Sequence, residues 1–247
     1  MRLFGLIGYP LSHSFSKKFF TEKFEREGIT DCQYEAFSIP AITDLPALVK
    51  KHPQLEGLNV TIPYKEQVIA YLDEKSDLVG KIHSCNCIKI SNGKLTGYNT
   101  DVPAFDQTLK EKLLPHHKKA LILGTGGAAK AVEYCLRRLK ITFKHVSRKP
   151  SAKNFSYEQL TDDLIRDHTL IINCTPLGMY PNIVEAPPIP YRALDSRHYL
   201  FDLIYNPEKT LFLQKGEEQG ASIKNGYEML VLQALESWRI WNDANEK

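Results

Sequence analysis

The glycine-rich turn that follows a short apolar strand is the segment with the clearest chemical use. Gly124 permits a tight turn, Gly126 lets backbone approach a phosphate group without a Cβ in the way, and Gly127 opens a helix. The N–H groups at a helix start, here those of Gly127 and Ala128, and the helix dipole favour an anion. This turn therefore predicts a pyrophosphate site. Ala129 stands where the pattern has its third glycine, and an ordinary glycine turn before a helix is the alternative.

The strand after that helix ends in a basic segment, which bears on the kind of nucleotide. Sites for NAD usually carry Asp or Glu there, roughly 20 residues beyond the turn, to hold the ribose 2′-hydroxyl. In this chain Val146 is followed by Ser147, Arg148 and Lys149, with Lys153 beyond, and no carboxylate is available. A guanidinium binds phosphate through two parallel hydrogen bonds, so Arg148 favours a 2′-phosphate and predicts NADP(H). A solvated basic loop is the alternative.

Three further segments combine small, polar and ionisable residues that a hydrophobic core does not require. They are residues 8–16 after the first expected strand, residues 59–65 at the end of the third, and Asn86 together with residues 97–101. The carboxyl ends of parallel strands meet at one edge of a sheet, where ligands bind. We therefore expect the first two segments to face a common pocket.

Strand and helix signals alternate along the chain, and these elements must position the polar segments. Alternation of this kind predicts an α/β fold with a mostly parallel sheet and right-handed crossovers. A new unit is expected to start near Asp101. The expected strands are Leu3–Tyr9, Gln33–Ile39, Gly57–Ile62, Cys87–Ile90, Leu95–Tyr98, Ala120–Leu123, Thr142–Ser147, Thr169–Asn173 and Tyr199–Leu203. The expected helices are Phe15–Glu27, Ile42–Lys51, Pro103–Leu114, Ala128–Lys140 and Tyr227–Asn242, with further helical segments up to about Ile82.

Charge and composition narrow the class of protein. The net charge of +3, from 32 basic and 29 acidic residues among 247, argues against a broad nucleic-acid surface. No stretch approaches the roughly 18 apolar residues of a membrane span, and the first residues lack the long apolar region of a signal peptide. The five cysteines are odd in number and lack metal-ligand spacing. We expect a cytoplasmic protein with reduced thiols, no metal, and no nucleic-acid or membrane partner.

Taken together, these motifs resemble the shikimate dehydrogenase family along nearly the whole chain. That family carries P-x-x-H-S-x-S, N-V-T-x-P-x-K and N-T-D stretches in this order, followed in the nucleotide domain by N-x-T-P-x-G-M, D-x-x-Y-x-P and G-x-x-M-L-V-x-Q-A. No single stretch is specific, whereas the combination is highly specific. The matching segments here are residues 10–16, 59–65, 99–101, 173–179, 202–207 and 226–234.

The resemblance implies reversible reduction of 3-dehydroshikimate to shikimate with NADPH, a step of the chorismate pathway to the aromatic amino acids. It implies two domains: residues 1–101 plus 227–247 bind substrate, and residues 102–226 form a Rossmann-like NADP-binding domain, so that the C-terminal helix returns to the first. It also assigns residues. The substrate would contact Ser14, Ser16, Thr61, Lys65, Asn86, Asp101, Tyr205 and Gln233. The cofactor would contact Gly124, Gly126, Gly127, Ala128, Ser147, Arg148, Lys149, Thr175, Met179 and Gly226.

Lys65 and Asp101 would form the catalytic pair of such an enzyme. Hydride transfer to a ketone builds negative charge on the carbonyl oxygen, which a nearby acid must stabilise and protonate. The ammonium of Lys65 can do this, and its amine can be the base in reverse, while Asp101 would orient it. Outside the resemblance, Lys65 is an ordinary solvated lysine and Asp101 an ordinary N-cap.

Two other functions are compatible with these residues. One is a quinate/shikimate dehydrogenase with looser choice of substrate and cofactor, against which the missing acid after Val146 counts. The other is a non-catalytic sensor that binds shikimate or NADPH, against which the presence of both Lys65 and Asp101 counts. The expected partner is a small-molecule substrate, and the protein is expected to be a monomer or a homodimer.

Overall fold

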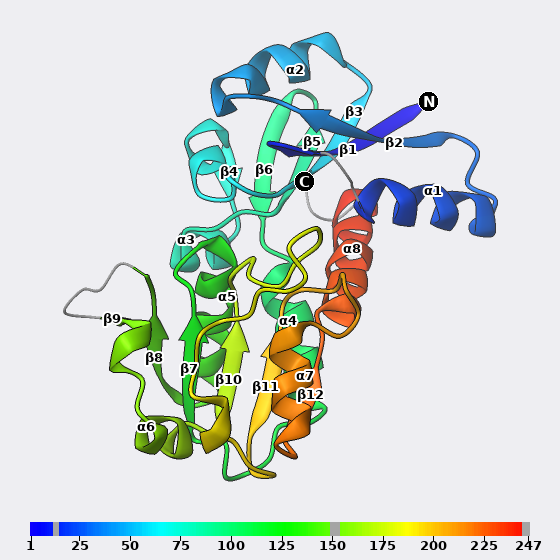
Figure 1. The fold of residues 1–247 in the computed structure, drawn as a ribbon. Helices are drawn as coiled ribbons and strands as arrows, with labels where there is room; N and C mark the ends of the chain where they lie inside the picture. The colour runs from blue at the N-terminus through cyan, green and yellow to red at the C-terminus, as the bar shows by residue number, and fades with distance from the viewer. Residues whose placement is uncertain (12–14, 149–153, 244–247) are drawn as a thin grey trace. The chain divides into compact units, whose positions relative to one another are not determined.

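Two six-stranded sheets organise the chain in the computed structural model, which describes residues 1–11, 15–148 and 154–243 (Figure 1). Unit 1 comprises Met1–Thr100 and Ala234–Lys247, and unit 2 comprises Asp101–Gln233. The sequence predicts slightly different boundaries, with one domain over residues 1–101 plus 227–247 and the other over residues 102–226. The substrate and nucleotide roles given to those domains stay predictions.

The sheet of unit 1 combines a parallel half with a hairpin. Its strands run in the order β2-β1-β3-β5-β6-β4, with β1 parallel to β2 and β3, and β5 antiparallel to β3 and β6. Asn92 and Gly93 turn the β5–β6 hairpin with φ of 52° and 77°, the left-handed conformation that an Asn-Gly turn provides. The strands are β1 (Arg2–Gly8), β2 (Cys32–Ser38), β3 (Leu55–Val60), β4 (Glu74–Lys75), β5 (Cys87–Ser91) and β6 (Lys94–Tyr98).

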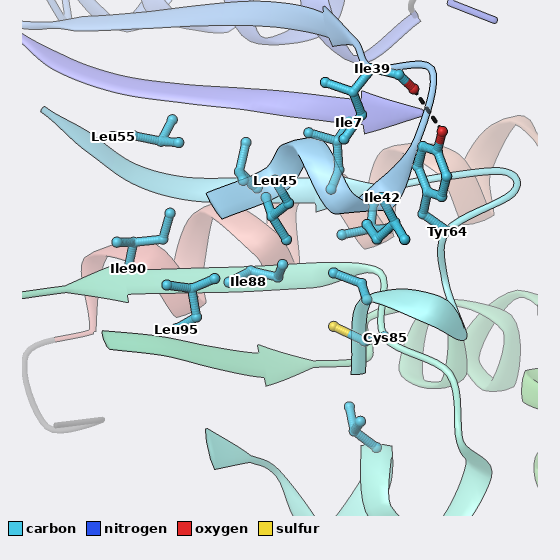
Figure 2. Packing of buried hydrophobic residues seen from close by; sticks show 14 of the residues in the cluster. Ile7, Ile39, Ile42, Leu45, Leu55, Tyr64, Cys85, Ile88, Ile90 and Leu95 are labelled. Carbon is cyan, nitrogen blue, oxygen red and sulfur yellow. Dashed lines mark hydrogen bonds between the residues drawn. The ribbon is translucent and has the colours of Figure 1, made fainter. Parts of the chain in front are cut away.

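One face of this sheet is covered by aliphatic side chains. Leu45, at the start of helix α2 (Leu45–Lys51), packs with Ile7 and Ile88 in this cluster (Figure 2). Leu58 belongs to the same cluster, and all four side chains are fully buried. The Tyr64 hydroxyl donates to the Ile39 carbonyl at 2.6 Å and so satisfies its polar end inside this core (Figure 2). The expected helix from residue 42 is a 3-10 turn (Ile42–Asp44) followed by α2. A 3-10 segment (Gln67–Tyr71) and α3 (Asp77–Ile82) follow β3.

The other face is covered by aromatic side chains from α1 (Phe15–Glu27) and from the C-terminal half of α8 (Tyr227–Asn242). Phe4 stacks on Trp241 with ring centroids 5.0 Å apart, and Phe20 stacks on Tyr34 at 4.5 Å. A Cβ on Gly57 would lie 2.4 Å from the Trp241 Nε1, so only glycine lets the C-terminal helix pack this closely. These stacked pairs fix α1 and α8 against the sheet.

The sheet of unit 2 is wholly parallel, and its strand order defines a nucleotide-binding architecture. The order β12-β11-β10-β7-β8-β9 is that of a Rossmann-type doubly wound sheet, in which the order reverses between β7 and β10. Ligands bind outside the carboxyl ends of the strands at this reversal. The strands are β7 (Lys119–Leu123), β8 (Thr142–Val146), β9 (Asn154–Phe155), β10 (Leu170–Asn173), β11 (Tyr199–Asp202) and β12 (Ser222–Lys224).

Helices cover both faces of this second sheet. Helix α5 (Gly127–Arg138) packs on β7 and β8, and α7 (Leu211–Glu218) packs on β11 and β12 (Figure 1). Helices α4 (Asp101–Lys110) and α6 (Asp162–Asp167) and the 3-10 turns Tyr157–Gln159 and Tyr191–Ala193 complete the unit. A parallel sheet buried on both faces requires continuous apolar strands, and residues 120–123 and 170–172 are all fully buried. The predicted α/β class is thereby confirmed.

Some boundaries differ from those expected. The connecting helix was expected over Pro103–Leu114, but α4 begins at Asp101 and ends at Lys110. Pro103 is its third residue, where the missing N–H is tolerated because the first turn has no intrahelical acceptor. Among the described residues, no helix is long and apolar enough to cross a membrane. In the same part of the chain, no three His, Cys, Asp or Glu side chains gather as a metal site would require.

Candidate active site

The turn after β7 has the geometry expected of the glycine-rich motif. Gly124 has φ of 108°, which side chains rarely permit, and a Cβ there would lie 3.2 Å from the Thr175 Cγ2. Its N–H donates to the Val146 carbonyl at 2.8 Å. The turn is therefore held between the ends of β8 and β10, at the reversal of the strand order.

The start of α5 offers a place for phosphate. Gly126 caps the helix with an extended backbone (φ −78°, ψ −176°) and supplies no side-chain hydrogen bond to the first N–H groups. A Cβ at Gly126 would meet nothing within 4 Å, so there is open space directly over this turn. The helix begins at Gly127 and continues through Ala128, and its dipole directs positive potential toward that space. These features fit a pyrophosphate group.

The basic segment follows β8, next to this turn. Ser147 N–H donates to the Phe155 carbonyl at 2.9 Å, which fixes the backbone where the segment begins. The Arg148 side chain is exposed. Lys149 and Lys153 lie outside the described residues. The structure thus places Ser147 and Arg148 beyond the strand adjacent to the glycine turn, where an adenosine 2′-phosphate is held in this architecture.

His145, on β8, is a contact of the turn that sequence reasoning missed. Its Nδ1 lies 3.0 Å from the Gly124 carbonyl oxygen, and its Nε2 lies 3.2 Å from a Glu133 carboxylate oxygen on α5. Because the carbonyl can only accept, Nδ1 carries the proton in this contact. Hydrogen bonds from Arg137 and His145 lower the pKa of Glu133 against the opposing effect of burial. The His145 ring therefore ties the turn to both β8 and α5.

Thr175 lies at the end of β10 and is held by a buried polar cluster. Its N–H and hydroxyl donate to the Asn173 Oδ1 at 3.0 and 2.6 Å. The Asn173 Nδ2 donates in turn to Asp202 Oδ1 at 3.0 Å, and the Thr210 hydroxyl donates to Asp202 Oδ2 at 2.6 Å. The sequence motifs contained Asn173 and Asp202 without giving them a role. Their role in the structure is to fix the backbone that carries Thr175.

The other residues predicted to border the cofactor also follow strands of unit 2. Met179 is exposed beyond β10. Gly226 lies beyond β12, where a Cβ would come within 2.1 Å of the Leu203 carbonyl oxygen, so the backbone passes too close for any side chain. Two residues predicted to contact the substrate, Tyr205 and Gln233, also belong to unit 2. Tyr205, beyond β11, is half-buried, and burial raises the pKa of its phenol. Gln233 is half-buried on α8 and donates to the Leu230 carbonyl at 2.9 Å.

In unit 1, the ends of β1 and β3 bring their polar segments together. Thr61 N–H donates to the Ile7 carbonyl at 3.0 Å, and Tyr9 N–H donates to the Ile62 carbonyl at 3.1 Å. A Cβ at Gly8 would lie 2.5 Å from the Thr61 Cγ2, which shows how closely the two strand ends approach. The described residues of the segments 8–16 and 59–65 therefore lie together at one edge of the sheet, and their facing a common pocket stays a prediction.

Lys65 and Asn86 are joined to this edge by backbone hydrogen bonds. Cys85 N–H donates to the Lys65 carbonyl at 2.7 Å, and Val60 N–H donates to the Asn86 carbonyl at 2.9 Å. Lys65 is half-buried, and Asn86 is only 2% exposed. Thr61, Lys65 and Asn86 therefore surround the carboxyl end of β3.

The remaining predicted substrate residues lie at the borders of this arrangement. Ser16 is buried on α1, and Ser14 lies outside the described residues. Asn86 Oδ1 accepts from Thr100 N–H at 2.7 Å, and Asp101, the next residue, is buried as the first residue of α4 and of unit 2. The pairing of Lys65 with Asp101 stays a prediction.

A Rossmann-type nucleotide unit joined to a second α/β unit with a polar strand edge defines the class of a two-domain dehydrogenase. A family model described as the shikimate dehydrogenase substrate binding domain matches residues 6–88. The shikimate dehydrogenase (NADP(+)) of Caldicellulosiruptor saccharolyticus is 35% identical over 266 residues, covering 98% of this chain and 93% of that protein. The chain belongs to the shikimate dehydrogenase family.

Solved structures agree with this relationship. The shikimate 5-dehydrogenase of Thermus thermophilus, in complex with NADP(H) and shikimate, matches with a TM-score of 0.85 and 29% identity, covering 98% of this chain and 94% of that chain. The shikimate 5-dehydrogenase of Listeria monocytogenes, in complex with shikimate and NAD, matches with a TM-score of 0.81 and 28% identity, covering 98% and 91%. The similarity extends through both units.

Proposed function

We propose that this protein reversibly reduces 3-dehydroshikimate to shikimate with NADPH. The proposal rests on one observation: this chain, a member of the family, carries both a sheet edge suited to the nucleotide and a sheet edge suited to the substrate. Unit 2 has a glycine turn at the reversal of a Rossmann-type sheet, followed by Arg148 in place of an acidic residue. Unit 1 has Thr61, Lys65 and Asn86 around the end of β3.

The nucleotide, when bound, supplies the hydride, and residues of unit 2 hold it. The N–H groups at the start of α5 and the open space over Gly126 suit the pyrophosphate. Arg148 suits the 2′-phosphate, because its planar guanidinium presents two parallel donors, and Ser147 and Lys149 flank it. We place Thr175, Met179 and Gly226 at the border of the same site.

Acid–base chemistry falls to Lys65. As hydride reaches the carbonyl carbon of the substrate, the carbonyl π electrons move to oxygen, and the Lys65 ammonium donates the proton that completes the hydroxyl. In the reverse direction the neutral amine removes that proton. Asp101 orients the lysine and hydrogen-bonds the reacting hydroxyl. Hydroxyls and amides hold the rest of the substrate, from Ser14, Ser16, Thr61, Asn86, Tyr205 and Gln233.

The experiment that tests the proposal measures formation of reduced nicotinamide from shikimate with NADP, beside NAD and quinate. Turnover of shikimate with NADP far above every other pairing supports the proposal. Comparable turnover with NAD or quinate would identify a broader quinate/shikimate dehydrogenase, an outcome that the Listeria structure with NAD makes worth measuring. A folded protein that binds shikimate or NADPH without turnover in any pairing would be a sensor, and the catalytic roles of Lys65 and Asp101 would be wrong.

A further inference from the structure

A chain of buried polar side chains crosses the interior of unit 1 on the aromatic face of its sheet. Tyr34 on β2, Asn59 on β3 and Ser237 on α8 are each at most 4% exposed. The Tyr34 hydroxyl donates to Asn59 Oδ1 at 2.8 Å, and Asn59 Nδ2 donates to Ser237 Oγ at 2.8 Å. At its first end, burial raises the pKa of the Tyr34 phenol, and an interaction with the Ser16 hydroxyl lowers that pKa in part.

The second end of the chain reaches Asn86. Ser237 Oγ lies 3.4 Å from Thr100 Oγ1, and Asn86 Nδ2 donates to the same Thr100 oxygen at 2.9 Å. The Thr100 N–H closes a second contact by donating to Asn86 Oδ1 at 2.7 Å. Thr100 is fully buried and directly precedes Asp101. The hydrogen-bonded network therefore runs from Tyr34 to Asn86, a predicted substrate residue, and Ser16, another predicted substrate residue, interacts with Tyr34 at its first end.

We infer that Tyr34, Asn59 and Ser237 are positioning residues that fix the side chains of Ser16 and Asn86 for the substrate. The inference rests on the proposed function, because shikimate is the ligand that those two side chains would hold. A buried hydroxyl or amide without a partner is costly, so each member of the chain restricts its neighbours to the rotamer that keeps every bond. Loss of one bond releases the rotamers at both ends without removing either substrate contact.

A purely structural role predicts something different. A network that only stabilises the fold changes the free energy of unfolding, while the molecules that remain folded bind substrate as before. A positioning role changes the KM for shikimate in molecules that are fully folded, and it leaves the KM for NADP alone because the network lies within unit 1. The ratio of the two KM changes therefore separates these roles.

The first variant is Tyr34→Phe, which removes the hydroxyl and keeps the ring that stacks on Phe20 at 4.5 Å. The matched control is Tyr191→Phe in unit 2, which also removes one hydroxyl donor, that of the partly buried hydrogen bond to the Pro187 carbonyl at 2.8 Å. We expect Tyr34→Phe to raise the shikimate KM on the order of tenfold, the equivalent of one lost buried hydrogen bond. The NADP KM should not change, and Tyr191→Phe should leave both values unchanged.

The second variant, Ser237→Ala, breaks the hydrogen-bond network near its other end. It provides the test if Tyr34→Phe fails to fold. It should also raise the KM for shikimate alone. Because both changes break one connected network, the double variant should raise the KM by less than the product of the two single effects. An unchanged shikimate KM in the folded variants, or an equal rise for shikimate and NADP, overturns the inference. Absence of shikimate turnover in the wild-type protein refutes instead the proposed function on which it rests.

Discussion

Replacement of Asp202 by Asn should alter how the stability of this protein depends on pH. The Asp202 carboxylate is fully buried at the end of β11, where Asn173 Nδ2 and the Ile204 N–H donate to Oδ1 and the Thr210 hydroxyl donates to Oδ2. Burial raises its pKa from 3.8 to about 7, and the three hydrogen bonds offset only part of that rise. The side chain is therefore a titrating group near neutral pH inside the nucleotide unit.

The sign of the effect follows from proton linkage. Between about pH 4 and about pH 7, the folded protein holds a proton on Asp202 that the unfolded chain releases, so folding becomes more favourable as the pH falls. With pKa values of about 7 folded and 3.8 unfolded, this group makes the wild-type protein about 2.6 kcal/mol more stable at about pH 5 than at about pH 8.

Asp202→Asn removes the titration and keeps the shape. The amide oxygen can accept from Asn173 and the Ile204 N–H, and the amide nitrogen can donate to the Thr210 oxygen once that hydroxyl rotates. The assay is denaturant unfolding of both proteins across the pH range, analysed as the difference between them, because every other titrating group cancels. We expect the variant to gain stability relative to wild type as the pH rises, by about the amount given above. Parallel pH curves for the two proteins would refute the reasoning.

Three further changes test the proposed site. Lys65→Ala should lower turnover by roughly 10²- to 10⁴-fold, the usual contribution of a general acid, while NADPH affinity measured by fluorescence titration stays near that of wild type. Arg148→Glu should weaken the affinity for NADPH by at least about tenfold and that for NADH far less, because it replaces a hydrogen-bond donor to the 2′-phosphate with a negative charge that repels it. Equal losses of affinity for both nucleotides would contradict the 2′-phosphate assignment. Gly226→Ala should lower the thermal unfolding midpoint by several degrees, because its Cβ would come within 2.1 Å of the Leu203 carbonyl and overpacking costs about 1–3 kcal/mol. An unchanged midpoint would show that the backbone there moves freely.

The elements predictable from sequence were those with strong local signals. The strand at 120–123 is a continuous apolar run, and the hairpin around Asn92 and Gly93 has the turn residues that its geometry demands. Several elements went unpredicted: β4 and β9 have two residues each and β12 has three, too few to show a period, and helix α7 has eight residues. Helix α6 has only six residues, although Thr161 does cap it by accepting from Leu164 N–H at 3.2 Å. Tertiary pairing at sheet edges, which no local pattern encodes, decides such elements.

The same distinction between local and long-range relations applies to the candidate site. Motif spacing indicated that Thr61 and Lys65 follow one strand, and that Gly124 turns another, because each relation is local. The polar network joins Tyr34, Asn59 and Ser237, whose separations of 25 and 178 residues leave no periodic trace. Asn59 did carry a signal, since an amide between Leu58 and Val60 on a buried strand must find partners or be costly. That signal predicts that partners exist, but only the fold decides which ones they are. The contribution of this network to binding thus becomes measurable through variants such as Tyr34→Phe, chosen from the structure rather than from the motif.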